Sequence, residues 1–301
     1  MSVLKDLRGA IGVTVTPFKQ DWQVDLDTVR AQAERLSQSD ITGVFPCAST
    51  GEFPHLSMRE QCDIYQATRE GLGDSKAFIA SACAPNLHQA IGYAQQAKAL
   101  KADACVACPP YYYPLTQEEV AAFYRALARE AGLPVILYHV PFFTTGIDIA
   151  TVETLMDIPS IIGLKDSSAN MKRIAHLCQL HAKRPAFLLY SGTDDCLLPA
   201  LAAGVDGSMT ALGAGAPALV AAVYQAFRQG DLPRAVQHQQ RMLPLLKAAD
   251  ALPFPLGYKL LAQAYHQLPM TEANHQLLPA QEVQAARKVI QSLLEQAQCQ
   301  G

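Results

Sequence analysis

The amino-acid sequence predicts a (β/α)8 barrel, the TIM barrel architecture, followed by a C-terminal helical segment. Eight short apolar runs alternate with segments of helical periodicity almost to residue 225. Each run is bounded by glycine, proline or polar residues, as is typical of the buried strands of a parallel sheet. Eight strand–helix units favour a closed barrel over an open sheet. We therefore expect a catalytic barrel over residues 1–225 and a helical segment over residues 226–301.

The expected strands share a short length and a high apolar content. In chain order they are Ala10–Val15, Thr42–Cys47, Ala77–Ala82, Asp103–Cys108, Pro134–Val140, Ser160–Lys165, Ala186–Gly192 and Asp206–Ala211. Because amphipathic stretches alternate with them, we expect βαβ units and a parallel sheet.

Two of the amphipathic stretches carry clear helix signals. Residues 25–39 have apolar positions at helical spacing and an acidic start. In residues 115–132, Thr116 and Glu119 have the spacing of a capping box, and Gly132 is a candidate C-cap. From about residue 233 the chain reads as helical throughout, which predicts the appended segment.

Composition and charge exclude several classes of protein. Apolar residues make up 50% of the 301 residues, whereas charged residues make up only 17%. The apolar fraction allows a large core. The low charged fraction indicates that much of the protein surface is buried, in a barrel core or at a subunit interface. The net charge of −3 argues against nucleic acid as a partner, because nucleic-acid-binding proteins usually present a basic face. We see no signal peptide and no apolar run of membrane-spanning length, so we expect a cytoplasmic protein.

The eight cysteines are expected to be reduced in that compartment. Cys105 and Cys108 form a C-x-x-C motif, but they lie on an expected strand rather than at a helix start. Residues three apart on a strand point to opposite faces, which favours core cysteines over a redox or zinc site. The chain has no second C-x-x-C to complete a zinc site.

Catalytic groups of a barrel lie at the carboxyl ends of its strands, so we looked for candidate catalytic residues at those positions. Reactive side chains at those ends are Thr14, Thr16, Ser49, Thr50, Tyr111, Tyr112, Tyr113, Tyr138, His139, Lys165, Asp194 and Asp195. Of the eleven lysines, Lys165 alone ends an apolar strand. Desolvation there favours the neutral amine, which is the form that attacks a carbonyl to make a Schiff base. The alternative is a structural ion pair with Asp166 or another carboxylate.

Other strand-end residues suggest a proton relay and an anion-binding turn. Tyr138 ends the preceding strand and should lie beside Lys165, where a phenol can move protons; a core tyrosine is the alternative. Ser49 and Thr50 in the S-T-G-E stretch can bind a small carboxylate or can simply begin a helix. Asp194 and Asp195 can bind sugar hydroxyls or cap a helix, but they supply too few oxygens for a metal.

Six ordered motifs resemble those of the dihydrodipicolinate synthase and N-acetylneuraminate lyase superfamily. They are TPF, STGE, PYYYP, YHVP, GLKDSS and SGTDD, and they cover essentially the whole chain. The resemblance implies a class I aldolase in which Lys165 forms a Schiff base with a pyruvate-type keto acid. It also implies that Tyr138 is the acid/base group and that Ser49 and Thr50 bind the carboxylate and relay protons.

The resemblance further implies that Tyr112 enters the site of a neighbouring subunit. The protein is then a homo-oligomer, a dimer or a tetramer, and it needs no metal or organic cofactor. By analogy with the lyase branch, the distal part of the substrate is expected to contact Ser167, Gly192, Asp194 and Asp195. Thr144 and Thr145 are further candidates for substrate binding.

Departures from the family pattern bear on the substrate. The synthase branch carries an arginine shortly after its Y-N-V-P motif, and residues 141–146 contain none. An arginine clamps a carboxylate in a way that Phe or Thr cannot replace. His139 stands where the family usually has asparagine, and Asp194–Asp195 where the sialic acid lyases have D-E. We therefore predict a lyase that cleaves or forms a C–C bond with pyruvate as one half, acting on a 2-keto-3-deoxy sugar acid or a related 2-keto acid. The alternatives are 4-hydroxy-tetrahydrodipicolinate synthase, a keto-deoxy sugar acid dehydratase and a non-catalytic ligand-binding barrel.

Overall fold

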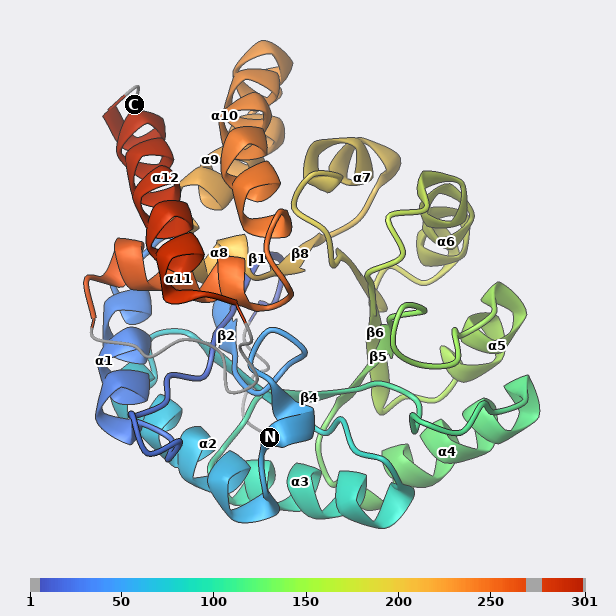
Figure 1. The fold of residues 1–301 in the computed structure, drawn as a ribbon. Coiled ribbons are helices and arrows are strands. Elements are labelled where there is room, and N and C mark those ends of the chain that lie inside the picture. The colour runs from blue at the N-terminus through green and yellow to red at the C-terminus, as the bar shows by residue number, and fades with distance from the viewer. Residues whose placement is uncertain (1–5, 269–277, 300–301) are drawn as a thin grey trace.

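A computed structural model describes residues 6–268 and 278–299 of the chain. Eight parallel strands close into one barrel in chain order, and β8 pairs back to β1 (Figure 1). The strands are β1 (Gly9–Val13), β2 (Gly43–Phe45), β3 (Ala77–Ser81), β4 (Ala104–Ala107), β5 (Val135–His139), β6 (Ile161–Asp166), β7 (Leu188–Ser191) and β8 (Gly207–Thr210). The predicted barrel is thus confirmed, and each strand lies within one residue of a predicted apolar run.

Helices surround the barrel and alternate with its strands (Figure 1). Those of the barrel are α1 (Leu26–Ser37), α2 (Met58–Leu72), α3 (Leu87–Ala99), α4 (Gln117–Glu130), α5 (Ile149–Leu155), α6 (Met171–Lys183), α7 (Leu197–Ala203), α8 (Leu212–Gly215) and α9 (Pro217–Arg228), with the 3-10 turn η1 (Phe53–His55) before α2. The C-terminal helices are α10 (Leu232–Asp250), α11 (Leu256–His266) and α12 (Ala280–Cys299).

The capping signals read from the sequence are present in the structure. Thr116 and Glu119 form a reciprocal capping box at the start of α4, and Gly132 follows that helix with a φ of 65°. Such a cap contributes about 1 kcal/mol by satisfying amides that the helix leaves unpaired. These local signals set the two ends of α4, and the N-terminal one also sets where the preceding loop ends.

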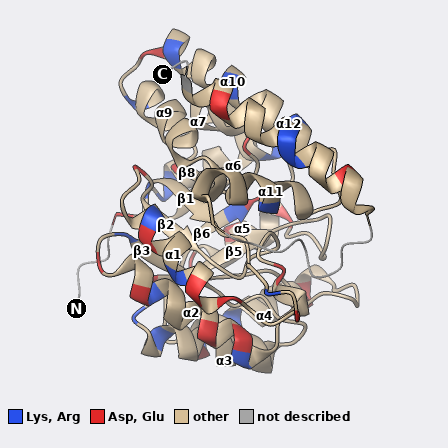
Figure 2. Ribbon diagram, turned by 60° about the vertical axis from the view of Figure 1, so that its left-hand side comes forward, with Lys and Arg blue, Asp and Glu red and all other residues tan. Residues whose placement is uncertain are grey.

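The strands are buried on both faces, as expected for a sheet covered by helices. In the eight strands, 35 of the 36 residues are buried, the exception being the half-buried Ile162. Most Lys, Arg, Asp and Glu residues lie on the helices and loops (Figure 2). Within the eight strands, the residues of these types are Lys165 and Asp166. The end of β6 therefore carries two consecutive charged residues in an otherwise apolar set of strands.

The C-terminal helices pack on one side of the barrel, beside α8, β1 and β8 (Figure 1). Helix α10 packs on α9, and α11 packs on both α8 and α12. The boundary that we expected between residues 225 and 226 falls inside α9. This packing carries the end of α10 and the start of α11 to the mouth of the barrel.

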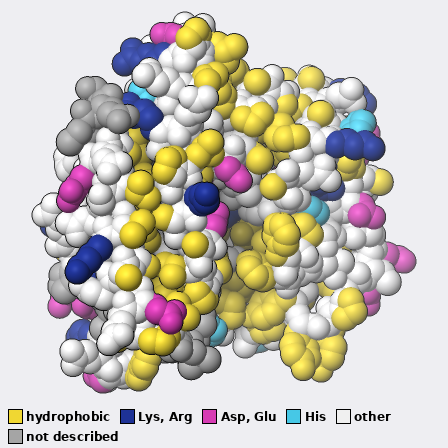
Figure 3. All heavy atoms as spheres, turned by 45° about the horizontal axis from the view of Figure 1, so that its top comes forward, with side chains coloured by type: hydrophobic (Ala, Val, Ile, Leu, Met, Phe, Trp, Pro, Cys, Tyr) yellow, Lys and Arg dark blue, Asp and Glu magenta, His cyan; other side chains and the backbone are white. Residues whose placement is uncertain are grey.

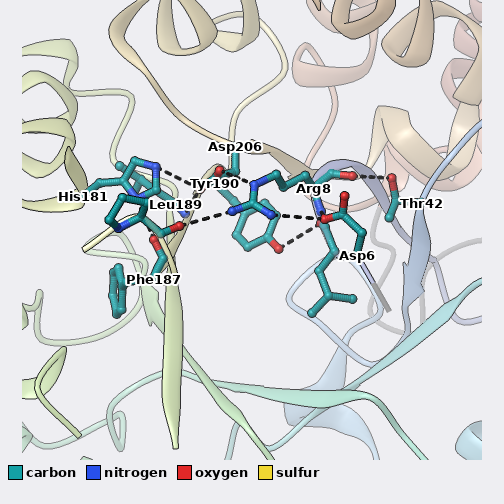
Figure 4. Close-up of polar contacts among 10 residues, drawn as sticks. Asp6, Arg8, Thr42, His181, Phe187, Leu189, Tyr190 and Asp206 are labelled. Carbon is teal, nitrogen blue, oxygen red and sulfur yellow. Dashed lines mark hydrogen bonds and ion pairs between the residues drawn. The ribbon is translucent and has the colours of Figure 1, made fainter. Parts of the chain in front are cut away.

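The opposite end of the barrel is closed by a polar cluster (Figure 4). The Arg8 guanidinium contacts Asp206 at 3.1 Å and donates to the carbonyl of Pro185 at 3.2 Å. Asp206 also lies 3.4 Å from His181, and the Tyr190 hydroxyl donates to the Leu7 carbonyl. This network ties the start of β1 to β7 and β8, and it lies at the end of the strands away from the reactive residues.

None of the helices in residues 6–268 and 278–299 is both long and apolar enough to cross a membrane.

Candidate active site

Lys165 and Tyr138 meet at the carboxyl ends of two neighbouring strands. They are paired in the register of β5 and β6, so their side chains leave the sheet together. The Lys165 amine lies 4.3 Å from the centre of the Tyr138 ring and 5.3 Å from that of Phe45. Both Lys165 and Tyr138 are 3% exposed. The amine is therefore held against aromatic faces in a poorly hydrated position.

The structural alternative for Lys165 was an ion pair with Asp166. The Asp166 carboxylate instead contacts Arg173 at 2.7 Å and accepts hydrogen bonds from the amide and hydroxyl of Ser168. Within residues 6–268 and 278–299, no carboxylate oxygen lies within 4.0 Å of the Lys165 amine. Arg173 thus neutralises Asp166 and leaves the lysine available for chemistry.

Ser49 and Thr50 lie on the turn that follows β2, facing Tyr138. The Ser49 and Tyr138 hydroxyls are 3.4 Å apart, so a proton can pass between them. The turn is closed by the Glu52 amide, which donates to the Ser49 carbonyl at 3.0 Å. The Thr16 hydroxyl supports it by donating to the Gly51 carbonyl at 2.6 Å.

A buried ion pair beneath this turn was missed by the sequence analysis. The Lys259 amine of α11 contacts the Glu52 carboxylate directly, and both side chains are almost fully buried. The amine also lies 4.4 Å from the centre of the Phe18 ring. Lys259 sits in a helical stretch of the sequence, and nothing local distinguishes it from a surface lysine. The pair fastens the C-terminal segment to the turn that carries Ser49 and Thr50.

A cavity of about 460 Å3 surrounds Lys165. Figure 3 shows a hollowed face with hydrophobic side chains on its rim. Of the residues expected in the site, the cavity is lined by Ser49, Thr50, Tyr138, Lys165, Ser167, Gly192, Asp194 and Asp195. The structure therefore brings most of the expected residues together around one space.

Gly192 is required by a close approach of two strand ends. A Cβ atom there would meet the Ser167 hydroxyl oxygen at 1.9 Å and the Asp166 carbonyl oxygen at 3.0 Å. The Gly192 amide donates to that same carbonyl at 2.7 Å. The absence of a side chain thus leaves room for Ser167 beside Lys165.

The far wall of the cavity is acidic. Asp194 is buried, and burial raises its pKa to about 7, with Asp195 contributing and the Leu212 amide and Lys165 acting against it. Asp195 is exposed at the rim. Asp250 at the end of α10 accepts a hydrogen bond from the Tyr258 hydroxyl at 2.8 Å, and both line the cavity. Lys165 is the one Lys or Arg among the described lining residues.

Two residues of the loop after β5 do not lie where we expected them. The Thr145 hydroxyl accepts a hydrogen bond from the Leu115 amide at 2.9 Å, so it joins two loops and does not line the Lys165 cavity. Thr144 lines an adjoining cavity of about 220 Å3. Neither residue lines the Lys165 cavity itself, and their expected contact with substrate stays a prediction.

His139 is a packed residue that shapes the same loop. Its Nδ1 accepts a hydrogen bond from the Ile147 amide at 2.9 Å. Burial lowers its pKa to about 4, against the opposing effect of Asp166. The imidazole is thus neutral near pH 7 and acts as an acceptor that closes the loop over residues 141–146.

Tyr112 lies outside the site of its own chain. It is 87% exposed, with a φ of 82°, and its ring stacks edge-to-face on that of Tyr113. Tyr111, by contrast, lines the 220 Å3 cavity together with Ser49, Phe143 and Phe254. Four residues line both cavities, namely Ser49, Val140, Phe143 and Phe254, so the two spaces adjoin beside Ser49.

Across residues 6–268 and 278–299, no group of three or more His, Cys, Asp or Glu side chains is arranged to hold a metal ion.

Comparison with known proteins identifies the family. The model of the dihydrodipicolinate synthetase family matches residues 6–297, nearly the whole chain. The chain belongs to the dihydrodipicolinate synthetase family. It is thus a lyase/aldolase-type protein of that family, as the six motifs indicated.

Some relatives in the family are named for a specific reaction, whereas others are named only as lyases. A protein of Thermofilum pendens named an uncharacterized DapA-like lyase is 30% identical over 281 residues, which cover 89% of this chain and 93% of the relative. A 4-hydroxy-tetrahydrodipicolinate synthase of Methanothrix thermoacetophila is also 30% identical, with the same coverage. The family relationship therefore leaves the substrate open.

Solved structures of the family share the fold. YagE, a prophage protein of the dihydrodipicolinic acid synthase family from E. coli K12, was solved in complex with pyruvate. It is 26% identical to this chain with a TM-score of 0.88, and the alignment covers 97% of this chain and 99% of YagE. The 4-hydroxy-tetrahydrodipicolinate synthase of Methylacidiphilum fumariolicum is 24% identical with a TM-score of 0.90 over 98% of each chain, a likeness of fold.

Proposed function

We propose that the protein is a Schiff-base-forming lyase with pyruvate as one half of its reaction. The observation that carries the proposal is the buried Lys165 amine, which lies against Tyr138, is not paired with Asp166 and opens into the 460 Å3 cavity. The pyruvate bound by the family member YagE supports the choice of keto acid.

In the proposed reaction, the Lys165 amine attacks the keto carbon, and water leaves to give an iminium. Tyr138 gives its hydroxyl proton to the departing water and becomes a phenolate. The phenolate then accepts the proton of the C4 hydroxyl through Ser49, and the C3–C4 bond breaks to release an aldehyde. The electron pair of that bond passes to the iminium, giving an enamine. Protonation at C3 and hydrolysis release pyruvate and the free lysine. Thr50 and the amides of its turn would hold the carboxylate. The lysine supplies the electron sink, so the proposal needs no metal or organic cofactor.

For the distal half, we propose a hydroxyl-rich chain, as in a 2-keto-3-deoxy sugar acid. The acidic far wall, Asp194, Asp195 and Asp250, supports this because carboxylates accept hydrogen bonds from hydroxyls and repel an anion. 4-Hydroxy-tetrahydrodipicolinate synthase is disfavoured for the same reason, since aspartate semialdehyde brings a second carboxylate.

A dehydratase is the second candidate, and Asp194 favours it. A buried carboxyl whose pKa is raised to about 7 can hold a proton near neutral pH and give it to a departing hydroxyl. Ser167 and Gly192 border the same part of the cavity.

Substrate comparison tests these alternatives. We expect cleavage of a 2-keto-3-deoxy sugar acid to pyruvate to exceed condensation of pyruvate with aspartate semialdehyde, and Lys165→Ala to abolish it. Faster condensation would identify the synthase, and loss of water without pyruvate release would identify the dehydratase. For a non-catalytic barrel, the same ligands would stabilise wild type and Lys165→Ala equally, with no turnover.

We further propose that Tyr112 completes the proton relay of a second subunit in a homo-oligomer. Its 87% exposure and the cavity open beside Ser49 support this. Mixing Lys165→Ala with Tyr112→Phe protein then restores activity, since a mixed dimer holds one site with both residues intact. If mixing restores nothing while the subunits exchange, Tyr112 does not cross.

A further inference from the structure

Cys108 has a thiol neighbour that its C-x-x-C motif does not reveal. Ser81 of β3 pairs with Val106 of β4, and the Ala82 amide continues the ladder by donating to the Val106 carbonyl at 2.7 Å. The same alignment two residues later places Cys83 opposite Cys108. Cys83, which follows β3, is thus the lateral neighbour of Cys108, which follows β4, although 25 residues separate them in the chain.

The Cys83 thiol contacts the backbone of Cys108. The Cys108 amide donates to the Cys83 sulfur at 3.3 Å. Neighbouring strands lie about 4.8 Å apart, within the roughly 4.4–6.8 Å of Cα separation that a disulfide needs. The backbone therefore holds both cysteines at a spacing that a covalent bond can close.

One member of the pair, Cys108, also borders a space that a small molecule can enter. Cys108 lines the 220 Å3 cavity together with Ser49 and Tyr111, and that cavity adjoins the one around Lys165. Both sulfurs are buried from bulk solvent, so the cavity is the route of access.

We propose that Cys83 and Cys108 form an oxidisable dithiol site, which a peroxide converts to a disulfide within the native barrel. One thiolate attacks a peroxide oxygen, the O–O bond breaks, and hydroxide leaves to give a sulfenic acid. The second thiol then attacks that sulfur and expels water. The dithiol is oxidised by two electrons, and hydrogen peroxide is reduced to two molecules of water.

The electrostatic surroundings favour ionisation of Cys83, whereas the neighbouring Cys83 thiol and burial raise the pKa of Cys108. Burial acts to raise the pKa of Cys83, but hydrogen bonds from Cys108 and Ser81 and the charge of Lys165 hold it below its ordinary value. Burial raises the pKa of Cys105, three residues before Cys108, to about 12. The thiolate is the reactive form, so Cys105 is a matched control in the same strand.

Peptide mapping under non-reducing conditions tests the proposal. The folded protein is treated with dilute hydrogen peroxide, and the cysteines that remain reduced are then alkylated. The protein is digested, and the peptides are analysed by mass spectrometry. We expect a linked peptide pair joining Cys83 to Cys108, which dithiothreitol separates. The link persists in Cys105→Ser and disappears in Cys83→Ser and in Cys108→Ser.

The wild-type digest decides the question even where a serine variant folds poorly. Both thiols remaining alkylatable after treatment would overturn the proposal. So would a map in which the half-buried Cys62 and Cys196 are oxidised while Cys83 and Cys108 stay reduced.

Discussion

The buried pair between Lys259 and Glu52 allows a quantitative prediction. Lys259 is 2% exposed and the Glu52 side chain 1% exposed, so neither charge is solvated when its partner is removed. Lys259→Met keeps the length and apolar stem of the side chain but removes the ammonium that contacts the buried Glu52 carboxylate. Breaking one side of such a pair costs about 3–5 kcal/mol. For a domain of this size, we expect the melting temperature to fall by on the order of 10 °C.

Thermal unfolding of three variants separates this pair from a general effect of losing a lysine. Lys247→Met, an exposed position on α10, should change stability by less than about 0.5 kcal/mol. The double variant Lys259→Met with Glu52→Gln should recover much of the loss, because no charge is then left buried. A cost below about 1 kcal/mol for Lys259→Met, or a double variant no more stable than the single one, would refute this reasoning.

Three further predictions concern the site. Tyr138→Phe keeps the ring beside Lys165 but removes the hydroxyl; we expect turnover to fall by about 10²–10⁴-fold with the melting temperature nearly unchanged, and an unchanged rate would remove Tyr138 from the relay. Gly192→Ala places a methyl group 1.9 Å from the Ser167 hydroxyl oxygen, so pyruvate binding measured by titration should weaken strongly. Gly230→Ala leaves binding unchanged, because Gly230 does not line the cavity and its φ of 77° makes any cost of that variant one of stability. The pKa of His139 falls from an ordinary 6.5 to about 4 on folding, so the unfolded chain binds the proton first as pH drops. The stability it contributes is full above pH 6.5 and is lost as pH falls toward 4; urea titrations at several pH values should show a smaller loss in His139→Gln, and an identical loss would contradict the assignment.

The sequence revealed what depends on local pattern and on strand order. Lys165 and Tyr138 could be placed together because they end consecutive strands, and a closed parallel barrel brings consecutive strands into register. Lys259, Asp250 and Tyr258 could not be found in this way. They reach the site through the packing of α10 and α11 on the barrel, and a helical pattern does not say which surface a helix covers.

Loop residues and tertiary pairs escaped prediction for the same physical reason. Thr145 binds the Leu115 amide, and the conformation of the loop that carries it has no periodic signal. Cys108 was weighed against Cys105, its neighbour in the chain, whereas its contact is Cys83 on the adjacent strand. Contacts between strands depend on register, which the motif spacing alone does not give.

Borohydride trapping with pyruvate tests the central claim most directly. The protein is incubated with pyruvate and sodium borohydride, and the adduct is located by intact mass and peptide mapping. We predict a single adduct on the peptide carrying Lys165, absent in Lys165→Ala, with Lys259 unmodified because its amine is buried against the Glu52 carboxylate. A folded protein that forms no adduct, or one that carries the adduct on Lys259, would contradict the account.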